Sequence, residues 1–296
     1  MFGVDEDGNA VFDLSGQYRG EPQETFVMRK SYRAPRLLLM LAHTIGMGLK
    51  REDGPVQAIT RQDGWDGYDV DGNFRKIGSE AVLRRPIENS PHPMQNELFP
   101  GELITHRSVE TKADEHWVSK KIKADIQQEG LDPDQILVIP LCKGRTNDMK
   151  NKEFVAEELE SLLGRHDIRI NPVWENDNKI FIHEGKVTLA GVNRAKGDEA
   201  GSVYVLGVDA INTEQWRDQE THRRNRLFVA ITRSGAWVSI SGTHPNASIH
   251  TEVSSVVDDV QSTLPHVIFE VPNSRELANE LEEGTEELES PTLDDF

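Results

Sequence analysis

The sequence has 296 residues, of which 36% are apolar and 28% are charged, and its formal net charge is −18. This length and composition allow one large α/β domain or two small ones around a packed core. The single cysteine, Cys142, excludes a disulfide framework and a thiolate zinc site, and its apolar surroundings predict a small core residue.

The first residues carry no targeting signal. They are acidic and contain no apolar core of a signal peptide. The longest dense apolar run, residues 37–42, is far shorter than a membrane span. We therefore expect a cytoplasmic protein that opens with a linker-like segment over residues 1–24.

Helical and strand-like patterns then alternate along a domain that we place at residues 25–270. Helices are predicted at residues 35–49, 112–128, 152–163 and 223–232. Strands are predicted at residues 103–109, 135–142, 168–173, 187–192, 203–208 and 236–241. This order predicts a mainly parallel sheet with helices on both faces, and in such sheets ligands bind at the carboxyl ends of the strands.

Two regions depart from this pattern. Residues 51–100 are rich in Gly, Pro, Asp and Asn, so we predict an irregular insertion with a few short strands. Residues 271–296 form an acidic tail that we expect to be disordered. Its end, Leu-Asp-Asp-Phe, resembles the partner-binding tip of bacterial single-stranded DNA-binding proteins, although a solubilising tail is the simpler interpretation.

Three short segments carry chemistry. In residues 223–234, a basic start and an apolar middle lead to Thr-Arg-Ser before a strand, which could aim the Arg233 fork at a phosphate. Residues 187–200 run from a strand into Lys-Gly-Asp-Glu, where Glu199 could accept a hydrogen bond from a ribose hydroxyl. Residues 31–35 place a tyrosine beside an arginine at a helix start, which suits base stacking and phosphate contact.

Each segment also has a structural explanation when it is taken alone. The first could be a surface helix whose arginines extend into solvent. The second could be a solvated turn between strands, and the third a tyrosine that packs on the core.

Together, the order and spacing of the three segments resemble those of the UvrD/Rep-type superfamily 1 DNA helicases. Ser-Tyr-Arg-Ala-Pro (residues 31–35) looks like motif IV. Arg-Ala-Lys-Gly-Asp-Glu-Ala (residues 194–200) looks like motif V. Arg-Leu-Phe-Val-Ala-Ile-Thr-Arg-Ser (residues 226–234) looks like motif VI. The resemblance covers about residues 25–242 and implies the second (2A) RecA-like domain of such a motor.

The resemblance also implies roles for single residues. Tyr32 would stack on adenine, and Arg33 and Arg233 would be the catalytic arginines at the γ-phosphate of ATP. Gly197 and Glu199 would line the ribose and triphosphate. The family's Thr and His for DNA are replaced by Gly191 and Asn193, which leaves Asn193 and Arg194 as the candidates for single-stranded DNA.

The sequence lacks the other half of an ATP site. Its only Gly-Lys, residues 185–186, is not part of a P-loop, and no apolar strand ends in Asp-Glu. We therefore expect no ATPase activity from this chain alone, with Mg²⁺ and the P-loop supplied in trans by a helicase N-terminal domain. The motor would unwind DNA in repair, recombination or defence. The alternative is a non-catalytic RecA-like adaptor or a truncated remnant of a helicase.

Overall fold

The computed structural model describes residues 29–57, 65, 67–73, 76–96, 103–109, 115–141, 149–174, 179–212 and 220–272. The predicted linker at residues 1–24, Cys142 and the tail from residue 273 onward lie outside these ranges. Within them, no helix is both long enough and apolar enough to cross a membrane.

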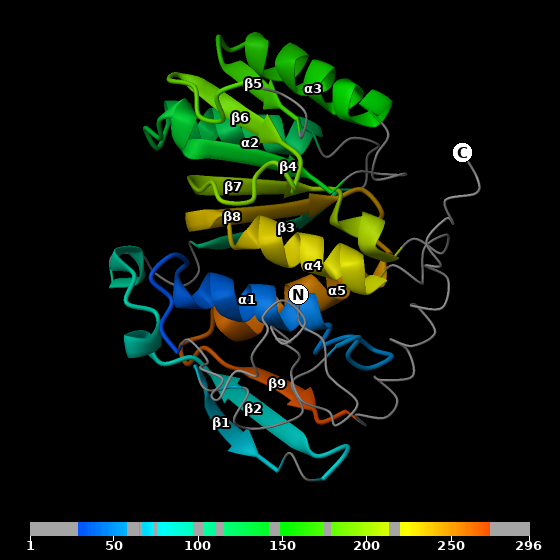
Figure 1. The fold of residues 1–296 in the computed structure, drawn as a ribbon. Helices are drawn as coiled ribbons and strands as arrows, with labels where there is room; N and C mark the ends of the chain where they lie inside the picture. Colours follow the sequence, from blue (N-terminus) through cyan, green and yellow to red (C-terminus); the bar gives the residue numbers. More distant parts are fainter. Residues whose placement is uncertain are drawn as a thin grey trace, which may run out of the picture.

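A six-stranded parallel sheet forms the centre of the molecule (Figure 1). Its strands, in spatial order, are β3 (Ile104–Ser108), β8 (Ser234–Gly242), β7 (Ala200–Leu206), β4 (Ile136–Pro140), β6 (Lys186–Ala190) and β5 (Arg169–Val173). The central strand β4, Ile-Leu-Val-Ile-Pro, is buried at every position. Continuous apolar runs of this kind are what a parallel sheet covered on both faces requires.

Helices cover both faces of this sheet, and the side chains of β4 show how the faces divide. Ile136 and Val138 belong to the core that α2 (Glu115–Gln127) and α3 (Met149–Gly164) build with the sheet. Leu137 and Ile139 belong to the core on the other face, with α4 (Glu220–Ile231) and α5 (Ser248–Val260). The predicted fold class is therefore confirmed: the chain has the mixed α/β architecture expected of a RecA-like domain.

Helix α1 (Arg36–Met47) lies deeper than the other helices. Ten of its twelve residues are buried, because it is enclosed between α4 and α5 on one side and a second sheet on the other (Figure 1). Its sequence is apolar all round, as a fully enclosed helix must be. The helix ends at Gly48, whose φ of 68° is the left-handed conformation that glycine adopts most readily.

The second sheet is small and antiparallel, in the order β1 (Asp69–Gly72), β2 (Glu80–Arg84), β9 (Val267–Glu270). The segment predicted as an irregular insertion thus contributes two strands, and the end of the predicted domain contributes the third. Short 3₁₀ helices complete the described chain: η2 (Ile87–Asn89), η3 (Pro93–Asn96), η5 (Pro133–Gln135) and η6 (Val208–Asn212).

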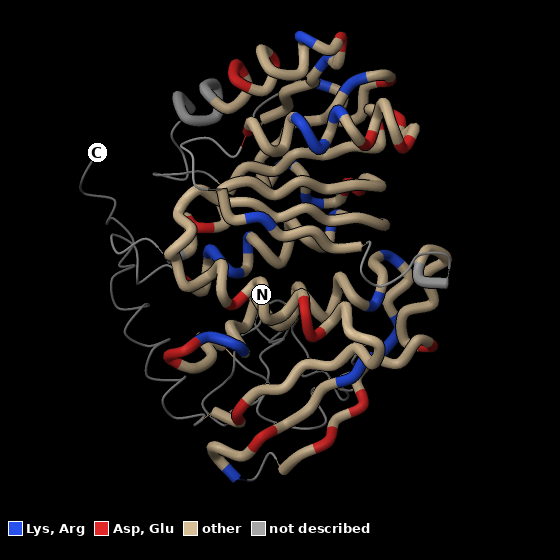
Figure 2. Tube along the Cα trace, turned by 180° about the vertical axis from the view of Figure 1, so that it is seen from behind, with Lys and Arg blue, Asp and Glu red and all other residues tan. Residues whose placement is uncertain are grey.

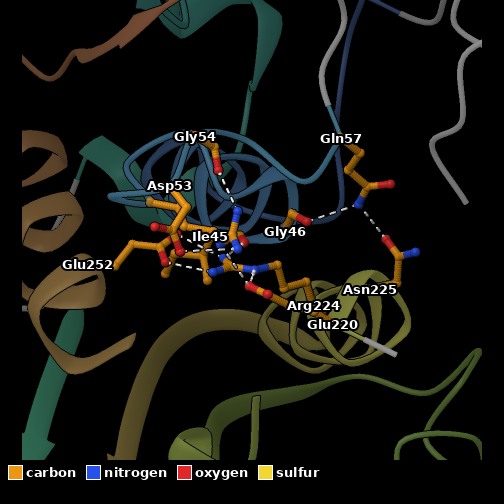
Figure 3. A network of polar contacts seen from close by, with 10 residues as sticks. Ile45, Gly46, Asp53, Gly54, Gln57, Glu220, Arg224, Asn225 and Glu252 are labelled. Atoms are coloured by element: carbon orange, nitrogen blue, oxygen red, sulfur yellow. Dashed lines mark hydrogen bonds and ion pairs between the residues drawn. The ribbon is translucent and has the colours of Figure 1, made fainter. Parts of the chain in front are cut away.

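A buried polar network joins the three helices on the α4 face (Figure 3). The fully buried guanidinium of Arg224, on α4, binds both carboxylate oxygens of Glu252 on α5 at 2.8 Å. It also donates to Glu220 at 2.8 Å and to the carbonyl of Ile45 on α1 at 2.7 Å. Because burying an ion is favourable only when its partners are in place, Arg224 makes the packing of α1, α4 and α5 interdependent.

Two histidines are held neutral by the fold. Burial, with the charge of Arg85 as a smaller contribution, lowers the pKa of His43 to about 4, and its Nδ1 lies 2.6 Å from the hydroxyl of Tyr68. Burial and the neighbouring His250 lower the pKa of His106 to about 4 as well. Both values lie below the usual histidine pKa of about 6.5.

We expect the free energy of unfolding to fall as the pH is lowered from about 6.5 to about 4. In this window the unfolded chain binds protons that the folded chain excludes, so the stability present above pH 6.5 is lost. His43→Asn should make this dependence shallower by about 1.4 kcal/mol per pH unit near pH 5. Urea unfolding between pH 7 and pH 4 measures it, with the exposed His183→Asn as the control. Equal slopes for His43→Asn and the parent chain would refute the expectation.

Candidate functional site

Three segments far apart in the sequence meet at the amino ends of β7 and β8. The two strands start side by side, with Ala200 paired to Ser234 and the amide of Ala200 bound to the carbonyl of Arg233 at 3.1 Å. Glu199 and Arg233 therefore precede adjacent strands. Arg33, just ahead of α1, reaches the same place because its Nη2 donates to the carbonyl of Gly197 at 2.9 Å.

These residues lie at the opposite end of the sheet from the one where we expect ligands. Parallel sheets usually bind ligands at the carboxyl ends of their strands, whereas Arg33, Gly197, Glu199 and Arg233 gather at the amino ends. The reason lies in residues 191–199, which leave the carboxyl end of β6 and return across the sheet to the start of β7. The site is thus built by a return crossover and by a helix end.

The crossover has a compact, turn-rich backbone. The amide of Ala195 donates to the carbonyl of Gly191 at 3.0 Å, and Val192 and Ala195 are buried in the core on the α4 face. Gly197 has a φ of 100°, which side-chain-bearing residues rarely adopt, although the space around it is open. The glycine is therefore required by backbone conformation, and this conformation presents its carbonyl to Arg33.

Arg33 and Glu199 form an ion pair at the surface of the site. Their side chains are 43% and 42% exposed. Exposed pairs of this kind contribute about 0–1 kcal/mol. Breaking this ion pair therefore costs little free energy, so Arg33 and Glu199 can each bind a ligand in place of the other.

Arg233 is the more firmly held of the two site arginines. It is buried at the end of α4, where its Nε donates to the carbonyl of Val229 at 3.1 Å. Burial lowers its pKa, the charge of Arg33 lowers it further, and Asp198 opposes the shift. Two guanidiniums that repel each other, carried by separate elements, would be stabilised by an anion with several oxygens, such as a phosphate.

Tyr32 directly precedes Arg33 in the sequence. It is 69% exposed on the bend that leads into α1. An exposed aromatic ring on the segment that carries Arg33 offers a stacking surface for a planar base.

Asn193 and Arg194, the residues predicted to bind DNA, behave differently. Asn193 is exposed. Arg194 already binds Asp198 and the carbonyl of Lys179, both at 3.4 Å, and its guanidinium lies 5.0 Å from the ring centre of Phe181. These contacts tie the crossover to residues 179–181, and the role of either residue in DNA binding stays a prediction.

Further cations that our sequence-based interpretation did not assign to the site lie along the crossover and α4. Burial lowers the pKa of His222, and so do the charges of Arg226, Lys196 and Arg223. The charges of these three residues therefore disfavour the protonated form of His222. Exposed Asp and Glu residues also lie on the strands of the small sheet (Figure 2). The sequence shows the spacing of the two arginines and the histidine on α4, but it does not show the approach of Lys196.

The described residues contain two carboxylates at the site, Asp198 and Glu199. Across these ranges no group of three His, Cys, Asp or Glu side chains could hold a metal ion. Glu199 faces Arg33, and Asp198 faces Arg194.

No protein-family model matches the sequence, and no curated protein matches it. Among solved structures, the chain is similar to the C-terminal domain of a possible DNA helicase from Lactobacillus plantarum WCFS1. The two share 10% identity with a TM-score of 0.43, over 77% of this chain and 96% of that chain. A likeness this distant does not assign a function.

Proposed function

We propose that this chain is the second motor domain of an ATP-dependent DNA helicase and supplies one half of its ATP site. The observation that carries the proposal is the convergence of Arg33 and Arg233 beside Gly197 and Glu199 at one edge of a parallel sheet. Each of these residues lies in one of the three motif-like segments.

In this proposal each residue has a distinct task. Tyr32 stacks on the adenine ring, and the Glu199 carboxylate accepts a hydrogen bond from a ribose hydroxyl once Arg33 has turned to the phosphates. Arg33 and Arg233 bind the γ-phosphate oxygens, where Arg233 stabilises the charge that develops during transfer. Magnesium, held by a P-loop domain that this sequence does not contain, would neutralise the phosphates from the opposite side.

ATP would then act as the bridge between two domains. The P-loop domain binds one side of the triphosphate, and Arg33 and Arg233 bind the other, so binding draws the two domains together. Repeated closure moves single-stranded DNA past Asn193 and Arg194, which would contact its phosphates. For Arg194 this requires that its bond to Asp198, at 3.4 Å, be exchanged for a phosphate.

The purified chain is expected to bind ATP weakly and to hydrolyse none, because two arginines and a stacking ring cannot position magnesium and the attacking water. Saturation-transfer NMR detects such weak binding, and a phosphate-release assay tests hydrolysis. Adding a P-loop helicase domain should strengthen binding and start DNA-stimulated hydrolysis. Hydrolysis by the chain alone, lost on Arg233→Ala, would contradict the split site.

The alternative function is a non-catalytic RecA-like adaptor. The ion pair between Arg33 and Glu199 favours it, because in the described structure each of the two side chains binds the other and not a nucleotide. An adaptor of this kind would hydrolyse no ATP, either alone or together with a P-loop domain, whether or not it binds ATP. A gene neighbour that encodes a P-loop and an Asp-Glu box would favour the motor.

A further inference from the structure

Arg85, at the end of β2, is a buried arginine outside the three motif-like segments. Its Nε donates to the hydroxyl of Ser90 at 2.6 Å. Its two terminal nitrogens donate to the carbonyls of Gly67 at 3.3 Å, Arg29 at 3.0 Å and Asn89 at 2.6 Å. The guanidinium thus holds three stretches of main chain together.

One of these stretches leads directly to Tyr32 and Arg33. Residues 29–35 form neither helix nor strand, so no regular ladder of hydrogen bonds fixes their course. Two bonds from the insertion replace that ladder: Arg85 to the carbonyl of Arg29, and the amide of Ser31 to the carbonyl of Asn89 at 2.9 Å. Arg36, the first residue of α1, adds a third by donating to the carbonyl of Arg85 at 3.3 Å.

The chemistry of Arg85 suits a main-chain clamp better than charge compensation. The partners above are main-chain carbonyls and one hydroxyl, and the guanidinium lies 5.2 Å from the ring centre of Tyr68. Burying a cation among neutral acceptors is favourable only if the geometry is good and the hydrogen bonds are all made. The planar fork of arginine can bind several carbonyls at once, whereas lysine presents a single nitrogen.

We propose that Arg85 is a positioning residue for the nucleotide site: it fixes the segment that carries Tyr32 and Arg33, and so makes the insertion part of that site. The inference rests on the proposed function. It gives the small sheet a role, since β2 ends at Arg84 and delivers Arg85 to the clamp. It also predicts a separable effect, because Arg233 lies between α4 and β8 and none of the bonds of the clamp involves it.

The test compares two probes on the purified full chain, ATP and inorganic tripolyphosphate. The ratio of their affinities reports the base contact of Tyr32, and a general loss of stability does not change that ratio. Arg85→Lys keeps the charge but loses the fork, so we expect about tenfold weaker ATP binding, with the ratio shifted toward that of Tyr32→Ala. Amide exchange should also become faster at residues 30–34 and stay unchanged next to Arg233.

Arg84→Ala is the matched control, because it removes the exposed arginine that directly precedes Arg85 in the sequence. Circular dichroism confirms that each variant is folded, and Ser90→Ala, which removes one bond of the clamp, should show a smaller shift in the same direction. An unchanged ratio in Arg85→Lys, with a collapsed ratio in Tyr32→Ala, overturns the role of Arg85 alone. No effect of Tyr32→Ala or Arg33→Ala on ATP binding overturns the nucleotide site and this inference with it.

Discussion

Replacing Arg224 by methionine is expected to lower the free energy of unfolding by about 3–5 kcal/mol. The substitution removes the cation but leaves the carboxylate of Glu252 buried among α1, α4 and α5 without its partner. The carbonyl of Ile45 loses a donor as well (Figure 3). Urea unfolding followed by circular dichroism measures the loss.

Two further variants make this expectation specific. Arg226→Met removes the same charge from the same helix at a partly exposed position, and it should lower the free energy of unfolding much less. The double variant Arg224→Met, Glu252→Met should recover much of the lost stability, because replacing both buried partners by apolar groups is far less costly than removing one. Arg224→Met with the stability of the parent chain would show that the network does not hold the helices together.

Arg233→Ala is expected to reduce ATP hydrolysis by about 10³- to 10⁵-fold once a P-loop helicase domain completes the site. Arg233 is held at the end of α4 by its bond to Val229, so its charge is placed before the nucleotide arrives. Such preorganised charge stabilises the transition state more than the bound ground state, and kcat should therefore fall more than KM rises. Steady-state kinetics with single-stranded DNA in excess measures both.

Arg165→Ala, at an exposed position just after α3, serves as the control and should leave kcat unchanged. Arg233→Lys keeps the charge without the planar fork, so its kcat should lie between those of the parent chain and Arg233→Ala. If Arg233→Ala bound and hydrolysed ATP like the parent chain, the residue would be a helix cap alone.

The central fold could be predicted because its signals are local. Each apolar strand and amphipathic helix from residue 103 to residue 241 shows its own periodicity. The strands β3 to β8 and the helices α2 to α4 lie at the positions that this periodicity predicts. Helix α5 was missed, although Ile249, Val253, Val256 and Val260 have helical spacing and are fully buried. The small sheet could not be predicted, because β2 pairs with β9 across more than 180 residues and neither strand exceeds five residues.

Some of the important residues of the site and its surroundings can also be identified from the sequence, and others cannot. Arg33, Gly197, Glu199 and Arg233 stand in motif-like segments whose order is visible in the sequence, and the structure brings them together. Arg224 and Arg85 carry no such signal. Arg224 lies in the same basic run as Arg226, and only the approach of Glu252 makes it a buried structural residue. The clamp of Arg85 depends on main-chain carbonyls, which every sequence provides.

Photoaffinity labelling with 8-azido-ATP tests the nucleotide site most directly. The azide sits on the adenine ring, so the label should appear on the peptide that contains Tyr32. Unmodified ATP should protect against it, and Arg33→Ala should reduce it. Protected labelling at the carboxyl ends of the strands, or no labelling that ATP can displace, would contradict the assignment of this edge of the sheet to ATP.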